Sequence, residues 1–310
     1  MISAQNLTRR FGGFTAVNDV SFEVGKGEII GFIGPNGARK TTTMRILTGF
    51  LPASEGRAMV AGHDVFEDSM SVRKKVGYLP ETPPLYPELS IGVYLRFIAE
   101  IRGIPSSKRT TRIGEVMELV GLSGWENRIL GSLSKGYRQR VGLAQAVIHD
   151  PEVLVLDEPA SGLDPTQVVG IREFIVDLAS RRTVILSTHI LPEVERICPR
   201  VVMINQGKIV ADGSLDEVCS KGGGGVRYRI ALKGSEGDNL AVLVSDLGAV
   251  DTVTPGGHTE GFQELIVHAP GDPRTAIAGL ATQNGWQIKA MEKVSPSLEE
   301  AFLKIVGRER

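Results

Sequence analysis

The feature that most constrains the fold is a short glycine-containing loop between an apolar run and a helical stretch. The apolar run EIIGFI leads into GPNGARKTTT, residues Gly34–Thr43, and the helical stretch MRIL follows. The pattern G-x-x-x-x-G-K-[S/T] in this setting places successive backbone N–H groups around an anion. Gly34, Lys40 and Thr41 match the pattern, whereas Arg39 stands where the second glycine is required.

A loop of this kind predicts a site for the phosphates of ATP. Its backbone N–H groups and the N-terminus of the following helix attract negative charge. Lys40 would reach the β- and γ-phosphates, and the Thr41 hydroxyl would ligate Mg²⁺. An ordinary glycine turn before a helix remains the alternative interpretation of the motif alone. The residues expected to bind the phosphates are Gly34, Asn36, Gly37, Ala38, Arg39, Lys40, Thr41 and Thr42.

Arg39 predicts an impaired site. Glycine before the lysine allows a backbone angle that a Cβ atom disfavours, and it lets the chain approach the β-phosphate closely. A side chain forced into such a conformation costs about 1–3 kcal/mol. We therefore expect weak ATP binding and slow hydrolysis. In the alternative, the loop is adapted and the guanidinium meets a phosphate oxygen.

Two acidic residues follow a second apolar run. Val153–Leu156 is uninterrupted and apolar, and Asp157, Glu158 and a proline come directly after it. Ligands of α/β sheets bind at the carboxyl ends of the strands. Asp157 is therefore expected to hold Mg²⁺, and Glu158 to orient or deprotonate the attacking water. A strand that merely meets solvent at its end is the alternative.

Further motifs flank this run in a fixed order. LSKGYRQR begins at Leu133, SGLD spans residues 161–164, and the run Thr183–Leu186 is followed by Ser-Thr-His, ending at His189. With the phosphate loop, this order resembles the nucleotide-binding subunit of ABC transporters over residues 1–220. LSKGY resembles the family signature, usually LSGGQ, the acids its Walker B end, SGLD its D-loop, and His189 its switch histidine.

The resemblance implies roles for several further residues. Phe11 stands where the family stacks an aromatic ring on adenine, although a core phenylalanine of an edge strand is the alternative. Glu81 replaces a glutamine that contacts Mg²⁺, and an acid can also ligate a hard cation. A solvated acid of a loop is the alternative for Glu81. Ser134 and Gly136 would meet the γ-phosphate of ATP bound by a second subunit, and Asp164 belongs to the D-loop. His189 would contact the γ-phosphate as a catalytic residue.

The first part of the chain predicts the α/β fold class. Buried β-branched runs suit a parallel sheet, and the alternating segment Leu7–Val24 suits an antiparallel edge sheet. By resemblance the fold is a P-loop NTPase of the ABC type over residues 1–221, with a helical subdomain at about 84–150. The expected helices of that subdomain are Ile91–Ile101, Arg109–Val120 and Lys135–Ile148.

The rest of the chain predicts a small accessory domain. Four consecutive glycines, residues 222–225, are typical of a linker. Residues 226–310 then read as β-α-β-β-α-β with a last helix at Leu298–Val306, which predicts a split β-α-β domain. Ser297 and Glu300 form a capping pattern at the start of that helix. The accessory domain, which ends in SPSLEEAF and a few further residues, resembles the C-terminal extension of exporter-type subunits in this family. The resemblance therefore implies that the direction of transport is export.

Charge and hydropathy limit the partners. The chain has 35 Lys+Arg against 36 Asp+Glu, a net charge of −1, which does not suggest a nucleic-acid partner. Two cysteines without metal spacing indicate a reducing compartment. No apolar run reaches the roughly 20 residues that span a bilayer. The resemblance to ABC transporter subunits implies a cytoplasmic subunit, peripheral on the inner face of the membrane, that drives a separate permease. It also implies a head-to-tail pair with a second ATPase subunit, identical or different.

Two other functions remain open at this point. A soluble ABC ATPase of translation or repair usually has two ATPase units or a long coiled-coil insertion, and neither is apparent here. A subunit with a defective nucleotide site, structural or regulatory, would pair with an active subunit. Arg39 is the residue that favours this second alternative.

Overall fold

The computed structural model describes residues 1–223, 226–235, 239–294 and 297–307, and they form two compact units. The first unit is Met1–Leu215 and the second Asp216–Arg310. The division falls shortly before the predicted glycine linker. Residues 224–225 of that linker lie outside the described residues, and helix α8 (Leu215–Gly223) extends to its second glycine.

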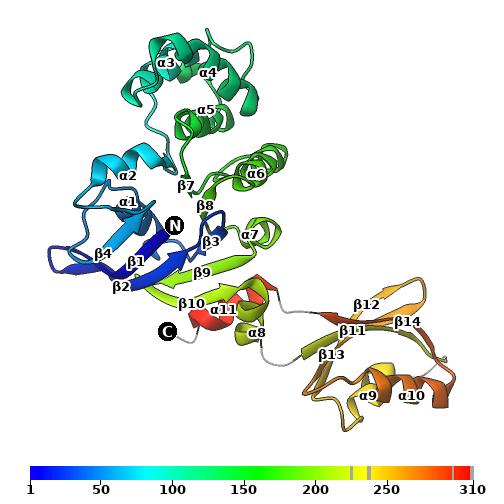
Figure 1. Ribbon diagram of the computed structural model, residues 1–310. Coiled ribbons are helices and arrows are strands. Elements are labelled where there is room, and N and C mark those ends of the chain that lie inside the picture. Colours follow the sequence, from blue (N-terminus) through cyan, green and yellow to red (C-terminus); the bar gives the residue numbers. More distant parts are fainter. Residues whose placement is uncertain (224–225, 236–238, 295–296, 308–310) are drawn as a thin grey trace. The chain divides into compact units, whose positions relative to one another are not determined.

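The first unit is built on a central six-stranded sheet (Figure 1). Neighbouring strands of this sheet run parallel, except that the edge strand β10 is antiparallel to β9. Buried β-branched and leucine side chains fill the inner strands, as expected for strands covered on both faces. In spatial order the strands are β10 (Lys208–Ser214), β9 (Arg200–Asn205), β3 (Ile29–Ile33), β8 (Thr183–Thr188), β7 (Val153–Asp157) and β6 (Val76–Leu79).

A separate antiparallel sheet lies beside this core. Its strands, in the order β2-β1-β4-β5, are β2 (Phe14–Val24), β1 (Ile2–Phe11), β4 (Glu55–Val60) and β5 (His63–Asp64). The antiparallel pairing predicted for Leu7–Val24 is confirmed. One hydrophobic core joins this sheet, the first helix and one face of the central sheet, and it includes Ile30 and Phe32 of β3.

Helices cover the central sheet, and three of them gather at one end of the unit (Figure 1). Their bounds are α1 (Lys40–Leu47), α2 (Ser69–Lys75), α3 (Ile91–Ile101), α4 (Ser106–Leu119), α5 (Lys135–Val147), α6 (Pro165–Ala179) and α7 (Leu191–Ile197), with a 3-10 turn at Leu130–Ser132. Helices α3, α4 and α5 lie where the helices of the helical insertion were predicted. The bounds of α3 match, α4 begins three residues earlier and ends one residue earlier than expected, and α5 ends one residue earlier. Helix α7 packs tightly on β3, because a Cβ atom on Gly31 would lie 2.5 Å from Val194.

The second unit contains a four-stranded antiparallel sheet in the order β12-β13-β11-β14. Helices α9 and α10 pack on one face of it through Ile277, Val244 and Tyr228, among others (Figure 1). The expected order β-α-β-β-α-β is present, and Ser297 Oγ accepts a hydrogen bond from Glu300 N as a helix cap. The elements are β11 (Val226–Lys233), α9 (Leu240–Ser245), β12 (Thr252–Thr259), β13 (Phe262–Ala269), α10 (Arg274–Asn284), β14 (Gln287–Val294) and α11 (Leu298–Gly307).

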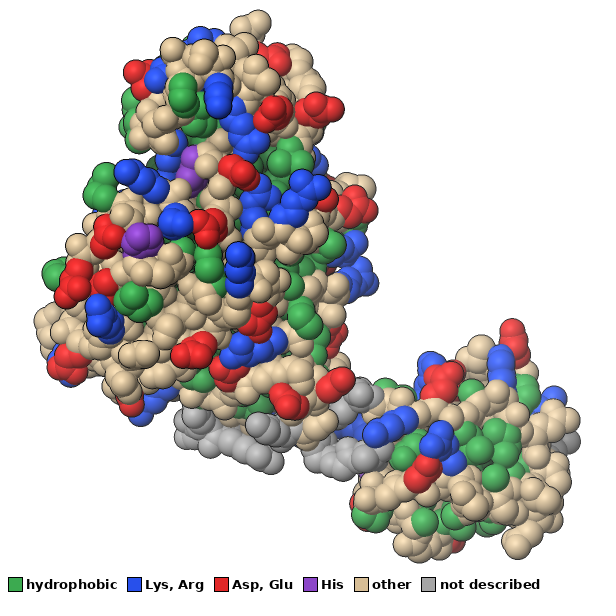
Figure 2. All heavy atoms as spheres, viewed as in Figure 1, with side chains coloured by type: hydrophobic (Ala, Val, Ile, Leu, Met, Phe, Trp, Pro, Cys, Tyr) green, Lys and Arg blue, Asp and Glu red, His purple; other side chains and the backbone are tan. Residues whose placement is uncertain are grey.

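Two surface properties bear on the expected partners. On the face drawn in Figure 2, basic and acidic side chains are interspersed over each unit. Within the described ranges, none of the helices combines the length and the apolar composition that crossing a membrane requires.

Candidate functional site

The central sheet brings four sequence motifs to one edge. Strands β3, β8, β7 and β6 are neighbours and run parallel, so the segments after their carboxyl ends meet there. These segments carry the glycine loop, His189, Glu158 and Glu81 respectively. They surround a cavity of about 460 Å³ whose lining residues are Asn36, Gly37, Ala38, Arg39, Lys40, Thr41, Thr42, Glu81, Glu158, Ser161 and His189.

The backbone of the glycine loop is held by contacts within the chain. At Gly34 a Cβ atom would lie 2.3 Å from the backbone oxygen of Ile204, so only glycine fits. Lys40 Nζ donates a hydrogen bond to Gly34 O at 2.8 Å, and Ala38 O accepts one from Gly207 N at 3.2 Å. The loop therefore curls around its own lysine, with helix α1 beginning directly behind it.

Arg39 has the left-handed backbone that the sequence predicted for this position. Its φ is 80° and its ψ 24°, close to the φ of 79° at Gly37. Because intramolecular hydrogen bonds hold the loop, the strain belongs to the fold and not to nucleotide binding. The Arg39 side chain is exposed, and its guanidinium carbon lies 4.7 Å from the ring centroid of Phe14.

Asp157 and Glu158 occupy different environments although they are adjacent. Asp157 is fully buried, and its Oδ1 accepts a hydrogen bond from Ser187 Oγ at 2.8 Å. Burial raises the pKa of Asp157, while hydrogen bonds from Thr41 and Ser187 oppose that rise. Glu158 lies at the strand end with a φ of 50°, which turns its side chain into the cavity.

The Glu158 carboxylate is the centre of a small polar network. One oxygen lies 3.5 Å from Lys40 Nζ, with both side chains 7% exposed. The other oxygen lies 2.8 Å from His189 Nδ1 and accepts a hydrogen bond from Thr188 Oγ1 at 3.2 Å. A carboxylate, an ammonium group and an imidazole thus converge where the loop faces the end of β7.

The oxygen donors of the site fit a magnesium ion. Asp157 Oδ2 is buried without a hydrogen-bond partner among the described residues, which is an arrangement that a cation would satisfy. Thr41 and Glu81 line the adjacent cavity. The described part of the chain contains no group of three or more His, Cys, Asp or Glu side chains that could hold a metal. Mg²⁺ suits such a sparse site because it keeps waters and takes phosphate oxygens as ligands.

Several residues expected at the site lie away from this cavity. Ser134 caps helix α5 and Asp164 caps helix α6, where its Oδ1 accepts from Gln167 N at 2.9 Å. Gly136 packs against the Gln167 side chain, since a Cβ atom there would lie 2.1 Å from its Oε1. Phe11 ends β1, half exposed, with the Arg9 guanidinium carbon 4.7 Å from its ring centroid.

Sequence reasoning assigned no site role to four residues that take part in the site. Ser187 and Thr188 hydrogen-bond the two acids, Ser161 lines the cavity, and Phe14 contacts Arg39. The signal for Ser187 is its position beside Asp157, since these residues pair across β7 and β8. That signal is usable only when the strand order is known.

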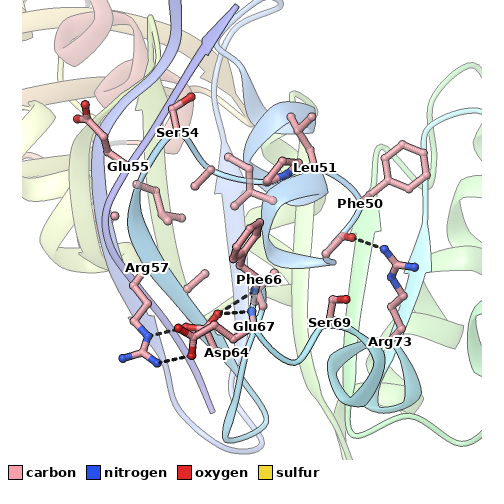
Figure 3. Close-up of a pocket in the computed structure, with 18 residues that line it drawn as sticks. Phe50, Leu51, Ser54, Glu55, Arg57, Asp64, Phe66, Glu67, Ser69 and Arg73 are labelled. Atoms are coloured by element: carbon pink, nitrogen blue, oxygen red, sulfur yellow. Dashed lines mark hydrogen bonds and ion pairs between the residues drawn. The ribbon is translucent and has the colours of Figure 1, made fainter.

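A larger cavity of about 750 Å³ lies elsewhere in the first unit, between the end of α1, strand β4 and the segment leading to α2 (Figure 3). Arg57 and Asp64 form an ion pair on its wall, and Asp64 Oδ1 accepts from the backbone of Phe66 and Glu67. The charged groups of Arg57 and Asp64 on this wall are thus already paired within the chain. The smaller cavity is the candidate site because the residues predicted to carry chemistry line it.

Comparison with known proteins agrees with this geometry. Residues 17–161 match the family model described as ABC transporter. The linearmycin resistance ATP-binding protein LnrL of Bacillus subtilis is 30% identical over 99% of each chain. A solved ATP-binding subunit of an ABC transporter is 29% identical, with a TM-score of 0.65 over 70% of this chain and 91% of that one.

A second solved structure shares the fold. It is a dimeric post-hydrolysis state of the ATP-binding cassette MJ0796 bound to ADP and Pi, 22% identical, with a TM-score of 0.64 over 69% of this chain and 99% of that one. The full-length match to LnrL includes the second unit as well as the first. This chain belongs to the ATP-binding subunits of ABC transporters, a family of ATPases.

Proposed function

We propose that this chain binds Mg-ATP in the cavity beside Lys40 and uses its hydrolysis to drive export through a separate membrane permease. The observation that carries the proposal is the convergence of Lys40, Glu158 and His189 at the end of a parallel sheet. Such a site combines a phosphate-binding cation with a carboxylate that can take a proton from water.

The contacts of each side chain support a separate role. Lys40 pairs with the β- and γ-phosphates, and Glu158 orients and deprotonates the attacking water. His189, half exposed and hydrogen-bonded to Glu158, contacts the γ-phosphate. Thr41, Asp157 and Glu81 would hold Mg²⁺. When bound, the ion would neutralise charge on the phosphate oxygens.

Arg39 impairs this site in our proposal. The strain of its backbone lowers the stability of the folded chain and not its affinity for nucleotide. The loss of affinity therefore arises from side-chain bulk where the phosphates approach the loop. We propose a reduction of at least tenfold in affinity and turnover relative to glycine, because residue 39 lines the cavity even with its guanidinium on Phe14. The same residue favours a second candidate function, a regulatory subunit whose own nucleotide site is defective and which pairs with an active cassette.

The placement of the signature residues supports a head-to-tail pair. Ser134 caps helix α5, Gly136 lies in its first turn, and neither lines their own chain's cavity. We propose that they and Asp164 meet the ATP of a second cassette, as in a two-fold dimer. Phe11 has one ring face against Arg9, and its other face is the proposed contact for adenine.

An exposed apolar stripe supports a membrane-protein partner. Val93, Phe97 and Ile101 recur along one side of α3 and are 53%, 42% and 64% exposed. Tyr86, 48% exposed, packs edge-on against Phe97 with ring centroids 5.9 Å apart. We propose this surface as the docking site of the permease, which would place the chain on the inner face of the membrane. Export is the proposed direction because LnrL is named for resistance to linearmycin.

Two measurements test the proposal. Phosphate release by the purified chain with its co-expressed permease should depend on Mg²⁺ and ATP. Binding of a labelled ATP analogue to the chain alone separates an active subunit from a defective one. If the complex does not hydrolyse ATP and the chain does not bind the analogue, the result would support the regulatory subunit with a defective nucleotide site.

A further inference from the structure

Two arginine side chains stack on two aromatic rings at the tip of the β1–β2 hairpin. Phe11 and Phe14 are directly opposite in the strand pairing. Arg9 lies over the first ring and Arg39 over the second, each with its guanidinium carbon 4.7 Å from the ring centroid. The Arg39 contact crosses from the glycine loop to another element. The contact with Phe14 therefore sets the direction of the Arg39 side chain, which stands where the motif requires glycine.

The alternative place for the Arg39 guanidinium is the cavity itself. Position 39 lines that cavity, and so do the carboxylates of Glu81 and Glu158. Guanidinium groups bind carboxylates through paired hydrogen bonds, which are stronger than neutral ones. Among the described residues, however, Arg39 forms no ion pair with either acid, and Phe14 is outside the cavity lining.

Occupation of the cavity by Arg39 would damage the site in two ways. The guanidinium would fill space that the phosphates need, and it would compete with Lys40 and His189 for the Glu158 carboxylate. The ring of Phe14 offers a competing position that keeps the cation partly in solvent, where such contacts are favourable.

We propose that Phe14 is a positioning residue that holds the Arg39 guanidinium outside the nucleotide cavity. The inference rests on the proposed function, because it concerns access of Mg-ATP to the same site. An exposed contact between a guanidinium and an aromatic ring corresponds to about a 2- to 5-fold change in an equilibrium. Removing the ring should therefore weaken Mg-ATP binding by that factor, and only when Arg39 is present.

A double-mutant cycle tests the effect on binding. Calorimetry would compare the present chain, Phe14→Leu, Arg39→Gly and the double variant. Leucine keeps an apolar side chain at the strand end but removes the ring. We expect Phe14→Leu to weaken Mg-ATP binding about 2- to 5-fold beside Arg39 and to have no effect beside glycine. An equal loss in both backgrounds, or no loss beside Arg39, would overturn the proposal. Equal loss would mean that Phe14 contacts the nucleotide directly.

A second measurement works without nucleotide. In NMR spectra of the arginine Nε–Hε groups, the Arg39 signal should carry an upfield ring shift that Phe14→Leu removes. In the Phe14→Leu variant the signal should then respond to Glu158→Gln, whereas in the present chain it should not. A response to Glu158→Gln while Phe14 is present would contradict the proposal. If Arg39→Gly binds no Mg-ATP, the proposed function fails, and these spectra still decide the role of Phe14.

Discussion

Lys40 Nζ lies 3.5 Å from Glu158 Oε1, and both side chains are almost entirely shielded from water. The lysine is the first residue of α1, behind the loop after β3, and the glutamate directly follows β7, with strand β8 between β3 and β7. The pair links the residue proposed to bind phosphate with the residue proposed to activate water. ATP phosphates that attract Lys40 would leave the Glu158 carboxylate available to a water molecule.

Replacing Glu158 by glutamine should lower ATP turnover by about 10²–10⁴-fold, because a positioned general base contributes on that order. Nucleotide affinity should be retained, since the amide keeps the size of the carboxylate. Turnover and calorimetric affinity are the measurements. Glu152→Gln, an exposed acid paired with Lys75 just before the same strand, is the matched control and should leave both unchanged. Normal turnover in Glu158→Gln would remove this residue from the mechanism.

Replacing Arg39 by glycine should raise Mg-ATP affinity and turnover by at least tenfold, by removing side-chain bulk beside the phosphates. It should also raise stability, because relief of about 1–3 kcal/mol of strain exceeds the entropy cost of glycine, about 0.5–1 kcal/mol. Calorimetry and urea denaturation measure the two effects. Gln206→Gly is the control, since Gln206 has a φ of 47° away from the cavity and should gain stability only. Equal affinity of the two chains would show that Arg39 is accommodated.

The double variant Val93→Glu and Phe97→Glu should abolish docking of the permease. Each places a charge within an exposed apolar stripe, and losing central interface contacts costs at least about tenfold in affinity. Co-purification from membranes measures docking, and circular dichroism checks the fold. Val176→Glu on α6 is the control, since this valine is also 50% exposed. Retention of the permease by the α3 variant, or its loss with Val176→Glu, would place the docking surface elsewhere.

His149 should make the fold sensitive to acid. Burial, together with the charges of Arg102 and Arg112, lowers the pKa of His149 from 6.5 to about 4, against a hydrogen bond to Val76 O and the charge of Asp150. Below pH 6.5 the unfolded chain binds a proton on this histidine that the folded chain does not. Stability is therefore lost as the pH falls from 6.5 to about 4, by about 3 kcal/mol.

Urea denaturation between pH 7 and pH 4.5 checks this effect. His149→Gln should lose less stability over that range than the present chain. His258→Gln, at an exposed histidine of β12, should follow the present chain. Identical pH dependence in all three proteins would show that His149 titrates in the folded state as it does in the unfolded one.

The sequence by itself determined the local patterns from which the candidate site was predicted and the elements that carry them. A glycine loop between an apolar run and a helix, and two acids after a second apolar run, are local patterns whose physics does not depend on the rest of the chain. The left-handed backbone at Arg39 is also local, because the motif defines a turn that requires it. Helix α2 was not predicted, since its stretch SMSVRKK carries one buried apolar side chain, Val72, and too weak a pattern.

Only the tertiary structure decided which of these groups touch. Lys40, Glu158 and His189 are distant in sequence and meet because parallel strands β3, β8 and β7 are neighbours in register. Strand order depends on packing of the whole core, which no single segment encodes. The contact of Arg39 with Phe14 likewise depends on where the β1–β2 hairpin packs beside the glycine loop. Local sequence sets backbone conformation, whereas side-chain neighbours far along the chain follow from the free energy of the folded core.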